Sequence, residues 1–261
     1  MATIQDILNT VPEPAGADVR TGIVEYDHDG TPLEGILAKD ANLTGRRPAV
    51  LVVHDWHGVN EHVEARVTML ARLGYVAFAA DIYGKGVRPT GAEAGEVAGS
   101  FYQDLGLLRA RARAGLDRLL EDPQVDPSRV VVMGYCFGGS TALELARTGA
   151  DLVGAVSFHG GLITHDPSDA GDIRAKLLVL TGAADPMVGD DKVHAWEDEM
   201  RAAPRVDWQL VSYANAMHAF AVPGTDAPDH GAQYQALADR RSWRALEEFL
   251  TEVFGPEQLA A

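Results

Sequence analysis

The amino-acid sequence predicts an α/β fold: a mostly parallel central sheet with an antiparallel N-terminal pair of strands and helices on both faces. The first observation is that short apolar, β-branched runs alternate with helical patterns almost throughout the 261 residues. The second is a turn signal, Asp29-Gly30, between two strand-like runs near the start. With 46% hydrophobic and 23% charged residues and no linker or repeat, the chain suits one domain spanning 1–261.

The elements of the first half are recognised by apolar runs and by apolar residues at helical spacing, such as Val63, Val67 and Leu70. The run 48–53, Pro-Ala-Val-Leu-Val-Val, suits a strand buried on both faces. In chain order we expect a short helix at 4–8, strands at 22–26, 33–38 and 48–53, a helix at 63–73, a strand at 75–80, a Gly- and Pro-rich loop at 84–95 and a helix at about 101–120.

The second half repeats the same alternation. Its last helix is indicated by Trp243, Leu246 and Leu250, which fall on one face at helical spacing. The expected elements are strands at 129–133, 152–158, 176–181 and 206–213 and helices at 140–147, about 192–202 and about 233–254.

The segment Gly134-Tyr135-Cys136-Phe137-Gly138-Gly139 joins a predicted strand directly to a predicted helix and contains the only cysteine. A strand that turns into a helix at G-x-C-x-G holds the central residue in a sharp turn and presents its side chain at the sheet edge. The helix N-terminus there favours thiolate over thiol, as a cysteine nucleophile requires. The alternative is that Cys136 is a small buried hydrophobic residue. The surrounding turn favours the nucleophile.

The composition excludes several function classes. Lys+Arg 22 against Asp+Glu 38 gives a net charge of −16, which argues against a nucleic-acid partner. One cysteine cannot form an internal disulfide, and the N-terminus lacks a signal-peptide pattern. No apolar run approaches the ~20 residues that span a bilayer. We therefore expect a cytoplasmic protein with no membrane partner and no cofactor.

Two further residues belong with Cys136. Asp185 lies in a polar turn after the strand 176–181, and His218 follows the strand 206–213. Active residues of an open parallel sheet gather at the carboxyl ends of its strands, so all three should meet on one edge. His218 would then take the Cys136 proton and return it to the leaving group, while Asp185 fixes the imidazole tautomer. The alternatives are a turn-capping aspartate and an ordinary loop histidine.

The histidines near the strand 48–53 suggest a metal site at first sight. His54, His57 and His62 lie close in sequence to Asp55. However, His54 and Asp55 are adjacent at a strand end and point in opposite directions, whereas a catalytic metal needs about three convergent ligands. We therefore predict no metal.

The chain resembles the dienelactone hydrolase family of α/β-hydrolases, which uses a Cys-Asp-His triad, from about residue 22 to residue 254. The motifs that carry the resemblance are G-Y-C-F-G-G at Cys136, H-D-W-H-G-V-N from His54, D-I-Y-G from Asp81, F-H-G-G from Phe158, G-A-A-D-P around Asp185 and H-A-F at His218. The resemblance implies an α/β-hydrolase fold and an oxyanion hole formed by the N–H groups of Phe137 and Trp56. It also implies that Asp55 takes the place of a glutamate that contacts the resting thiol and gates its reactivity.

The sequence departs from this family where the substrate is held. The family binds the substrate carboxylate with two arginines, and the corresponding positions are Lys85 and Val222. Ala219 follows the histidine where a serine is expected. Lysine cannot reproduce a bidentate fork and valine offers no donor. The remaining substrate-binding candidates are Tyr83, Tyr135 and His159, each of which could instead be a core residue.

Three function classes remain. The leading prediction is a thiol-dependent esterase or lactonase that acts on small neutral or weakly anionic esters, as a monomer or homodimer. The second is a binding protein on a hydrolase scaffold, which retention of Cys136, Asp185 and His218 argues against. The third is a thiol redox protein that uses Cys136 without a second, resolving cysteine. Turnover of esters separates the first class from the other two.

Overall fold

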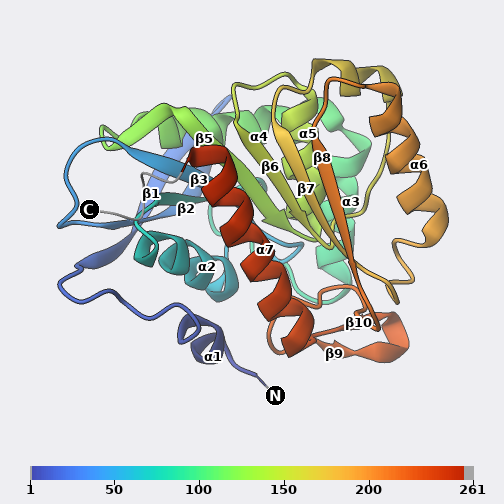
Figure 1. Ribbon diagram of the computed structural model, residues 1–261, viewed down its shortest axis with the longest axis horizontal. Helices are drawn as coiled ribbons and strands as arrows, with labels where there is room; N and C mark the ends of the chain where they lie inside the picture. The colour runs from blue at the N-terminus through green and yellow to red at the C-terminus, as the bar shows by residue number, and fades with distance from the viewer. Residues whose placement is uncertain (1, 256–261) are drawn as a thin grey trace.

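The computed structural model describes residues 2–255 and contains one eight-stranded sheet, drawn in Figure 1. Its strand order is β1-β2-β4-β3-β5-β6-β7-β8. The strands are β1 (Val19–His28), β2 (Thr31–Asp40), β3 (Arg47–Val53), β4 (Val76–Ala80), β5 (Val125–Tyr135), β6 (Gly154–Phe158), β7 (Lys176–Gly182) and β8 (Trp208–Tyr213). β1 pairs with β2 and β2 with β4 in antiparallel fashion, and all other pairs are parallel. The predicted sheet, with its antiparallel N-terminal pair, is therefore confirmed.

Helices cover both faces of this sheet, as Figure 1 shows. The helices are α1 (Ile4–Leu8), α2 (Glu61–Arg72), α3 (Ala92–Gln103), α4 (Leu105–Leu120), α5 (Phe137–Arg147), α6 (Asp190–Ala202) and α7 (Ala236–Phe254). Among residues 2–255, no helix combines the length and apolar character needed to cross a membrane.

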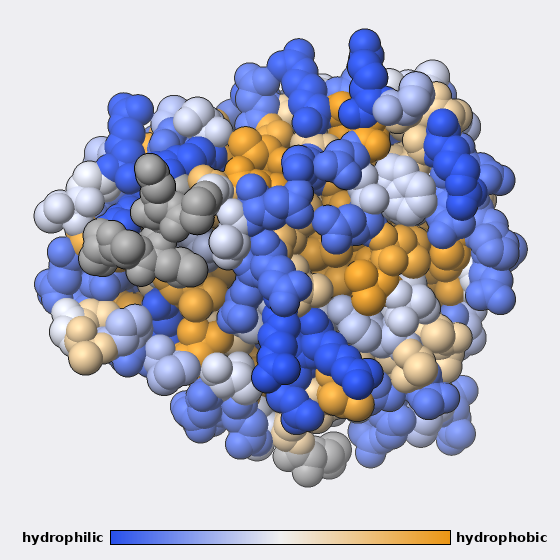
Figure 2. Space-filling model, in the orientation of Figure 1, coloured by the Kyte–Doolittle hydropathy of each residue, from blue (hydrophilic) through white to orange (hydrophobic). Residues whose placement is uncertain are grey.

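The core lies in two layers, one on each side of the sheet. Along β3, Ala49, Leu51 and Val53 join the layer packed under α3 to α6, while Val50 and Val52 join the layer under α2 and α7. Successive strand residues point to opposite faces, so a strand covered on both sides must be apolar throughout. In Figure 2 polar side chains dominate the face seen, and apolar surface is visible to the right of α7, where β6 to β8 lie in Figure 1.

The structure corrects the prediction of one helix at 101–120 after a loop at 84–95. Helix α3 already begins at Ala92, and a break at Asp104 separates it from α4. Asp104 leaves the helical conformation, and its carboxylate accepts a hydrogen bond of 2.9 Å from the Leu107 N–H, which caps α4. Asp104 thus ends α3 because it leaves the helical conformation to cap α4.

A small region after β8 was not anticipated from the sequence. The strands β9 (Asp226–Ala227) and β10 (Ala232–Gln233) form a two-stranded sheet around the 3₁₀ helix Pro228–His230. These elements are too short to show a periodic apolar pattern.

Candidate active site

The strand β5 passes directly into α5 at Cys136, which sits in a strained backbone conformation with φ 54° and ψ −114°. Its N–H donates to the Phe158 carbonyl of β6 at 2.9 Å, which fixes the turn to the neighbouring strand. A Cβ atom on Gly134 would lie 2.2 Å from the Gly138 backbone, so only glycine allows strand and helix to approach this closely. The elbow therefore presents the Cys136 side chain at the carboxyl edge of the sheet.

His218 lies between Cys136 and Asp185. Its Nε2 is 2.9 Å from the Cys136 sulfur, and its Nδ1 is 2.8 Å from Asp185 Oδ2. The other Asp185 oxygen accepts from the Met187 N–H at 2.8 Å, which orients the carboxylate in its turn. The structure therefore brings the three predicted residues, Cys136, His218 and Asp185, into one hydrogen-bonded row.

The protonation of His218 follows from its two partners. Burial alone favours the neutral imidazole, but the charge of Cys136 and the hydrogen bond to Asp185 outweigh it and raise the pKa of His218 to about 10. The imidazolium form is thus favoured at neutral pH. A cation in this position can donate a proton to a leaving group.

The loop that carries Trp56 is held close to the elbow. A Cβ atom on Gly138 would lie 2.2 Å from the Val53 carbonyl oxygen and 2.5 Å from that of His54, so the end of β3 touches the start of α5. Within residues 2–255, the backbone N–H groups of Trp56 and Phe137 have no hydrogen-bond partner. Two free N–H groups beside a nucleophile can donate hydrogen bonds to an oxyanion.

A cavity of about 280 Å³ opens above the Cys136 sulfur. No lysine or arginine lines it within the described part of the chain. Its lining residues are Asp55, Trp56, His57, Cys136, Met187, His218, Ala219, Val222, Thr225, Ala227, His230 and Ala232.

Several of these lining residues come from the segment that follows β8, and sequence reasoning missed them. Thr225, Ala227, His230 and Ala232 belong to or flank the β9–β10 region and form one wall. The same region fixes the histidine, because the His218 N–H donates to the Gly231 carbonyl at 3.0 Å. The one local signal is Gly231, which has φ 75° and packs against Pro186, but a lone glycine does not reveal what it supports.

Asp55 is buried beside the cavity, and its carboxylate is directed toward its own loop. One oxygen accepts from the His57 N–H at 2.8 Å and lies 3.4 Å from Asn60 Nδ2. The other oxygen lies 3.9 Å from His62 Nδ1. Among the described residues no hydrogen bond joins Asp55 to Cys136. The predicted thiol gate stays a prediction.

The four predicted substrate-binding residues do not line this cavity. Lys85 lies at the surface, 2.5 Å from Glu25 and 4.0 Å from Glu34, which compensate its charge. Tyr83 is buried, with its ring centroid 5.2 Å from that of Phe137 behind the elbow. Their roles in substrate binding stay predictions.

Tyr135 and His159 are fully buried beneath the row of Cys136, His218 and Asp185. The Tyr135 ring centroid lies 4.6 Å from that of His62. The His159 ring lies 5.3 Å from that of His218, and burial together with the charge of His218 holds the pKa of His159 well below its usual value. His159 is therefore a neutral neighbour of His218.

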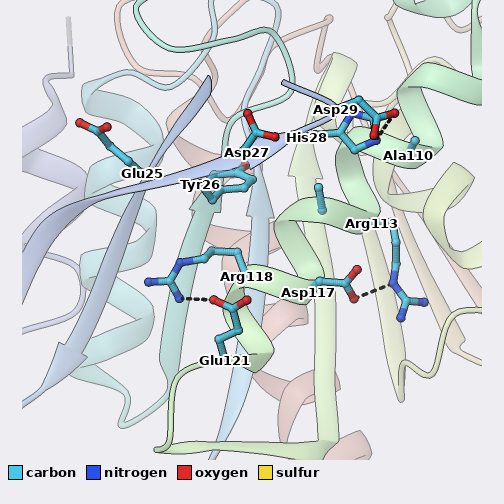
Figure 3. Close-up of a pocket in the computed structure, with 11 residues that line it drawn as sticks. Glu25, Tyr26, Asp27, His28, Asp29, Ala110, Arg113, Asp117, Arg118 and Glu121 are labelled. Carbon is cyan, nitrogen blue, oxygen red and sulfur yellow. Dashed lines mark hydrogen bonds and ion pairs between the residues drawn. The ribbon is translucent and has the colours of Figure 1, made fainter. Parts of the chain in front are cut away.

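Two other features bear on ligand binding. Among residues 2–255, no group of three or more His, Cys, Asp or Glu side chains could hold a metal ion. Figure 3 shows a second cavity, of about 610 Å³, between residues 25–29 of β1 and its turn and helix α4. Ion pairs of Arg113 with Asp117 and of Arg118 with Glu121 partly neutralise it, and it shares no lining residue with the cavity at Cys136.

Comparisons with known proteins agree with one another. The model of the dienelactone hydrolase family matches residues 33–254. A solved dienelactone hydrolase-like promiscuous phosphotriesterase from metagenomic libraries is 41% identical, covers 92% of this chain and all of its own, and has a TM-score of 0.87. A putative carboxymethylenebutenolidase of Salmonella typhimurium is 25% identical over 93% of this chain and 90% of its own. The structure of a putative dienelactone hydrolase of Klebsiella pneumoniae, 24% identical with a TM-score of 0.74 over 90% of this chain and 99% of its own, shares the fold.

Proposed function

The chain belongs to the dienelactone hydrolase family, and from that premise we propose that it hydrolyses small esters or lactones through an acyl-enzyme intermediate on Cys136. As a member it is a hydrolase with an α/β-hydrolase fold. The observation that carries the proposal is the row of hydrogen bonds from Cys136 through His218 to Asp185, at 2.9 and 2.8 Å. A nucleophile, a base and a group that orients the base are what covalent acyl transfer needs.

In the first half of the reaction, the Cys136 thiolate attacks the ester carbonyl carbon and forms a C–S bond. The carbonyl electrons move to oxygen, and the N–H groups of Phe137 and Trp56 stabilise the oxyanion. When the tetrahedral intermediate collapses, the C–O bond breaks and the leaving alkoxide takes the proton of His218. The products of this half are the alcohol, a thioester on Cys136 and a neutral imidazole.

In the second half, the neutral His218 removes a proton from water, and the resulting hydroxide attacks the thioester carbonyl. The C–S bond then breaks, which releases the carboxylic acid and restores the thiolate beside the imidazolium. Asp185 accepts a hydrogen bond from Nδ1 throughout, so it keeps Nε2 aimed at sulfur and water and stabilises the cation.

The cavity favours neutral substrates. It contains one carboxylate, Asp55, and no lysine or arginine lines it in the described residues. An anionic substrate would therefore find no lysine or arginine to pair with, and the His218 imidazolium is already paired with Asp185. The net charge of the protein, −16, disfavours an anionic substrate further. We assign small neutral esters and lactones to this site, and we place the enzyme in the cytoplasm.

Neutral phosphotriesters are a second candidate class. The structural relative with 41% identity is named as a promiscuous phosphotriesterase, and an uncharged triester suits a cavity that no lysine or arginine lines in the described residues. In this reaction Cys136 would attack phosphorus, and the leaving alkoxide would take the same His218 proton. Turnover of a neutral aryl phosphotriester by the wild-type protein tests this candidate.

The test of the main proposal compares the wild-type protein with Cys136→Ala on a neutral aryl acetate. We expect turnover to fall by several orders of magnitude in the variant. The circular dichroism spectrum should not change, because the lost group is small and half-buried. Near-wild-type turnover in a folded Cys136→Ala protein would overturn the proposal. Peroxide consumption without any ester turnover would instead favour the redox class.

A further inference from the structure

Arg66 is a buried arginine in the middle of α2, with about 1% of its side chain exposed. Its guanidinium donates to three nitrogen or oxygen acceptors, and Nη1 also lies 3.9 Å from the Met69 sulfur. Nε donates to His62 Nε2 at 3.2 Å, and Nη2 donates to Asp239 Oδ1 at 2.6 Å and to the Ala221 carbonyl at 2.8 Å. Only one of these acceptors is a charged partner. The other two are the His62 imidazole, one turn earlier on α2, and the carbonyl of Ala221, in the loop that follows His218.

The first of these acceptors, His62, belongs to α2 itself and follows directly on the loop that carries Trp56. Because His62 Nε2 accepts from Arg66, the single proton of the neutral imidazole must sit on Nδ1. Burial and the Arg66 charge hold the pKa of His62 well below its usual value, so this imidazole stays neutral. His62 Nδ1 lies 3.9 Å from Asp55 Oδ2, and the other Asp55 oxygen accepts from the His57 N–H. Arg66 thereby fixes the tautomer of the group that faces Asp55.

The second acceptor, the Ala221 carbonyl, lies in the loop that carries His218. Ala221 follows His218 by three residues and is buried, so its carbonyl needs a partner inside the protein. Arg66 supplies that partner. The same loop is joined to the start of α7, because the Gln235 N–H donates to the Phe220 carbonyl at 3.0 Å. Asp239 on α7 also accepts from the Tyr234 hydroxyl at 3.0 Å, so it is held in place on both sides.

We propose that Arg66 is a positioning residue for the hydrolysis, which sets the loop of the Trp56 N–H against the loop of His218. The proposal rests on the proposed function. In the reaction, the oxyanion donor and the base must act on one carbonyl group at the same time. Their two loops come from distant parts of the chain. The guanidinium binds the His218 loop directly at the Ala221 carbonyl, and it acts on the Trp56 loop through His62 of the same helix, whose Nδ1 faces Asp55 at 3.9 Å.

The energetics of buried charges favour a positioning role over a purely stabilising one. A buried ion pair such as Arg66–Asp239 recovers little net free energy of folding, because desolvation of both groups offsets their attraction. Neutral residues of similar size can often replace such a pair without loss of stability. They cannot replace the planar fork that reaches several acceptors at once.

The experiment uses the double variant Arg66→Met/Asp239→Asn, which removes both charges together and keeps a partner for the Tyr234 hydroxyl. The matched control is Arg72→Met on the same helix. Arg72 donates to the carbonyls of Leu8 and Val11, at 2.8 and 2.9 Å, and touches neither active-site loop. We expect kcat for a neutral aryl acetate to fall about tenfold to a hundredfold in the double variant. KM should change little, and the control should keep the wild-type kcat.

Arg66→Lys provides a second variant. It keeps the positive charge beside Asp239 and so protects the fold, but it cannot reach His62 and Ala221 together. We expect the same loss of kcat. A folded Arg66→Lys or double variant with wild-type kcat and KM would overturn the proposal.

A second readout separates this proposal from the proposed function. The rate at which iodoacetamide alkylates Cys136, measured against pH, reports the pairing of Cys136 with His218 without any ester. If the wild-type protein hydrolyses no ester, the proposed function fails. A profile that still shifts in Arg66→Lys, and not in Arg72→Met, then supports the positioning role. An unchanged profile in Arg66→Lys overturns that role.

Discussion

His218 Nε2 lies 2.9 Å from the Cys136 sulfur, although 82 positions separate the two residues in the chain. The contact exists because β5 and β8 both end at the carboxyl edge of the sheet, one at the elbow and the other before the loop of His218. The pairing of His218 with Cys136 also determines how the stability of the protein and the reactivity of Cys136 should depend on pH.

The stability of the protein should fall in mildly alkaline solution. The pKa of His218 is raised from 6.5 to about 10 in the folded state, so the folded protein binds this proton more tightly than the unfolded chain does. Its contribution to the free energy of unfolding is complete below pH 6.5 and is lost as pH rises toward 10. Urea unfolding at several pH values measures it. We expect a flatter dependence in His218→Gln, and equal slopes in both proteins would contradict this assignment.

The opposite dependence is expected from His159. Burial and the nearby His218 charge hold the pKa of His159 well below its ordinary value of 6.5 in the folded state, so the unfolded chain binds this proton more tightly. His159 then stabilises the fold above pH 6.5 and loses that contribution as pH falls below it. On acidification below pH 6.5, the free energy of unfolding should therefore fall less in His159→Phe than in the wild-type protein.

The exposed His194 offers the control for this measurement. His194→Phe makes the same substitution at a solvent-exposed position, so the comparison isolates the effect of burial at residue 159. If His159→Phe and the wild-type protein lose stability in parallel on acidification, His159 is not the buried neutral group described above.

The sequence pointed to Cys136, His218 and Asp185 because each of them has a local signal. Cys136 lies in a glycine-rich strand-to-helix turn, and Asp185 and His218 each follow an apolar strand. The wall formed by Thr225 and Ala227 has no such signal, because two-residue strands show no periodicity. Its position depends on tertiary contacts, including that of Gly231 with Pro186.

Side-chain direction was also beyond the sequence. Tyr135 precedes Cys136 and is a predicted substrate contact, but its ring lies below the sheet edge, with its centroid 4.6 Å from those of His62 and Phe158. Likewise, Lys85 follows the D-I-Y-G motif at the carboxyl end of β4, yet its ammonium group forms an ion pair with Glu25 at the surface. The position of a residue at a strand end predicts the edge of the sheet on which it lies. It does not predict which cavity its side chain faces.

Asp55 tests whether the thiol is gated. A carboxylate near Cys136 disfavours a second negative charge, so Asp55→Asn should increase the rate of Cys136 alkylation at neutral pH in the absence of substrate. The measurement is the pH profile of alkylation in both proteins. Identical profiles would mean that Asp55 acts only on its own loop, through the His57 N–H and Asn60.

Substrate charge tests the character of the cavity. With no lysine or arginine among its described lining residues, the site should use a neutral aryl acetate at least as well as an anionic dienelactone. The comparison is kcat/KM for the two substrates. A preference for the dienelactone of more than about tenfold, or roughly 1.4 kcal/mol, would show that a cation outside the lining reaches the substrate. One such cation is Arg88, which follows β4 and lies 3.8 Å from Glu34 and 3.9 Å from Asp81.

Detection of the covalent intermediate is the most direct test of the thioester mechanism. The wild-type protein is mixed with excess neutral aryl acetate, quenched in acid within the first turnover, digested and analysed by mass spectrometry. We predict one acetyl group on the peptide that contains Cys136, formed in a burst equal to the enzyme concentration and absent from Cys136→Ala. Steady ester hydrolysis with no acetyl group on Cys136 at any quench time, and no burst, would contradict the thioester mechanism.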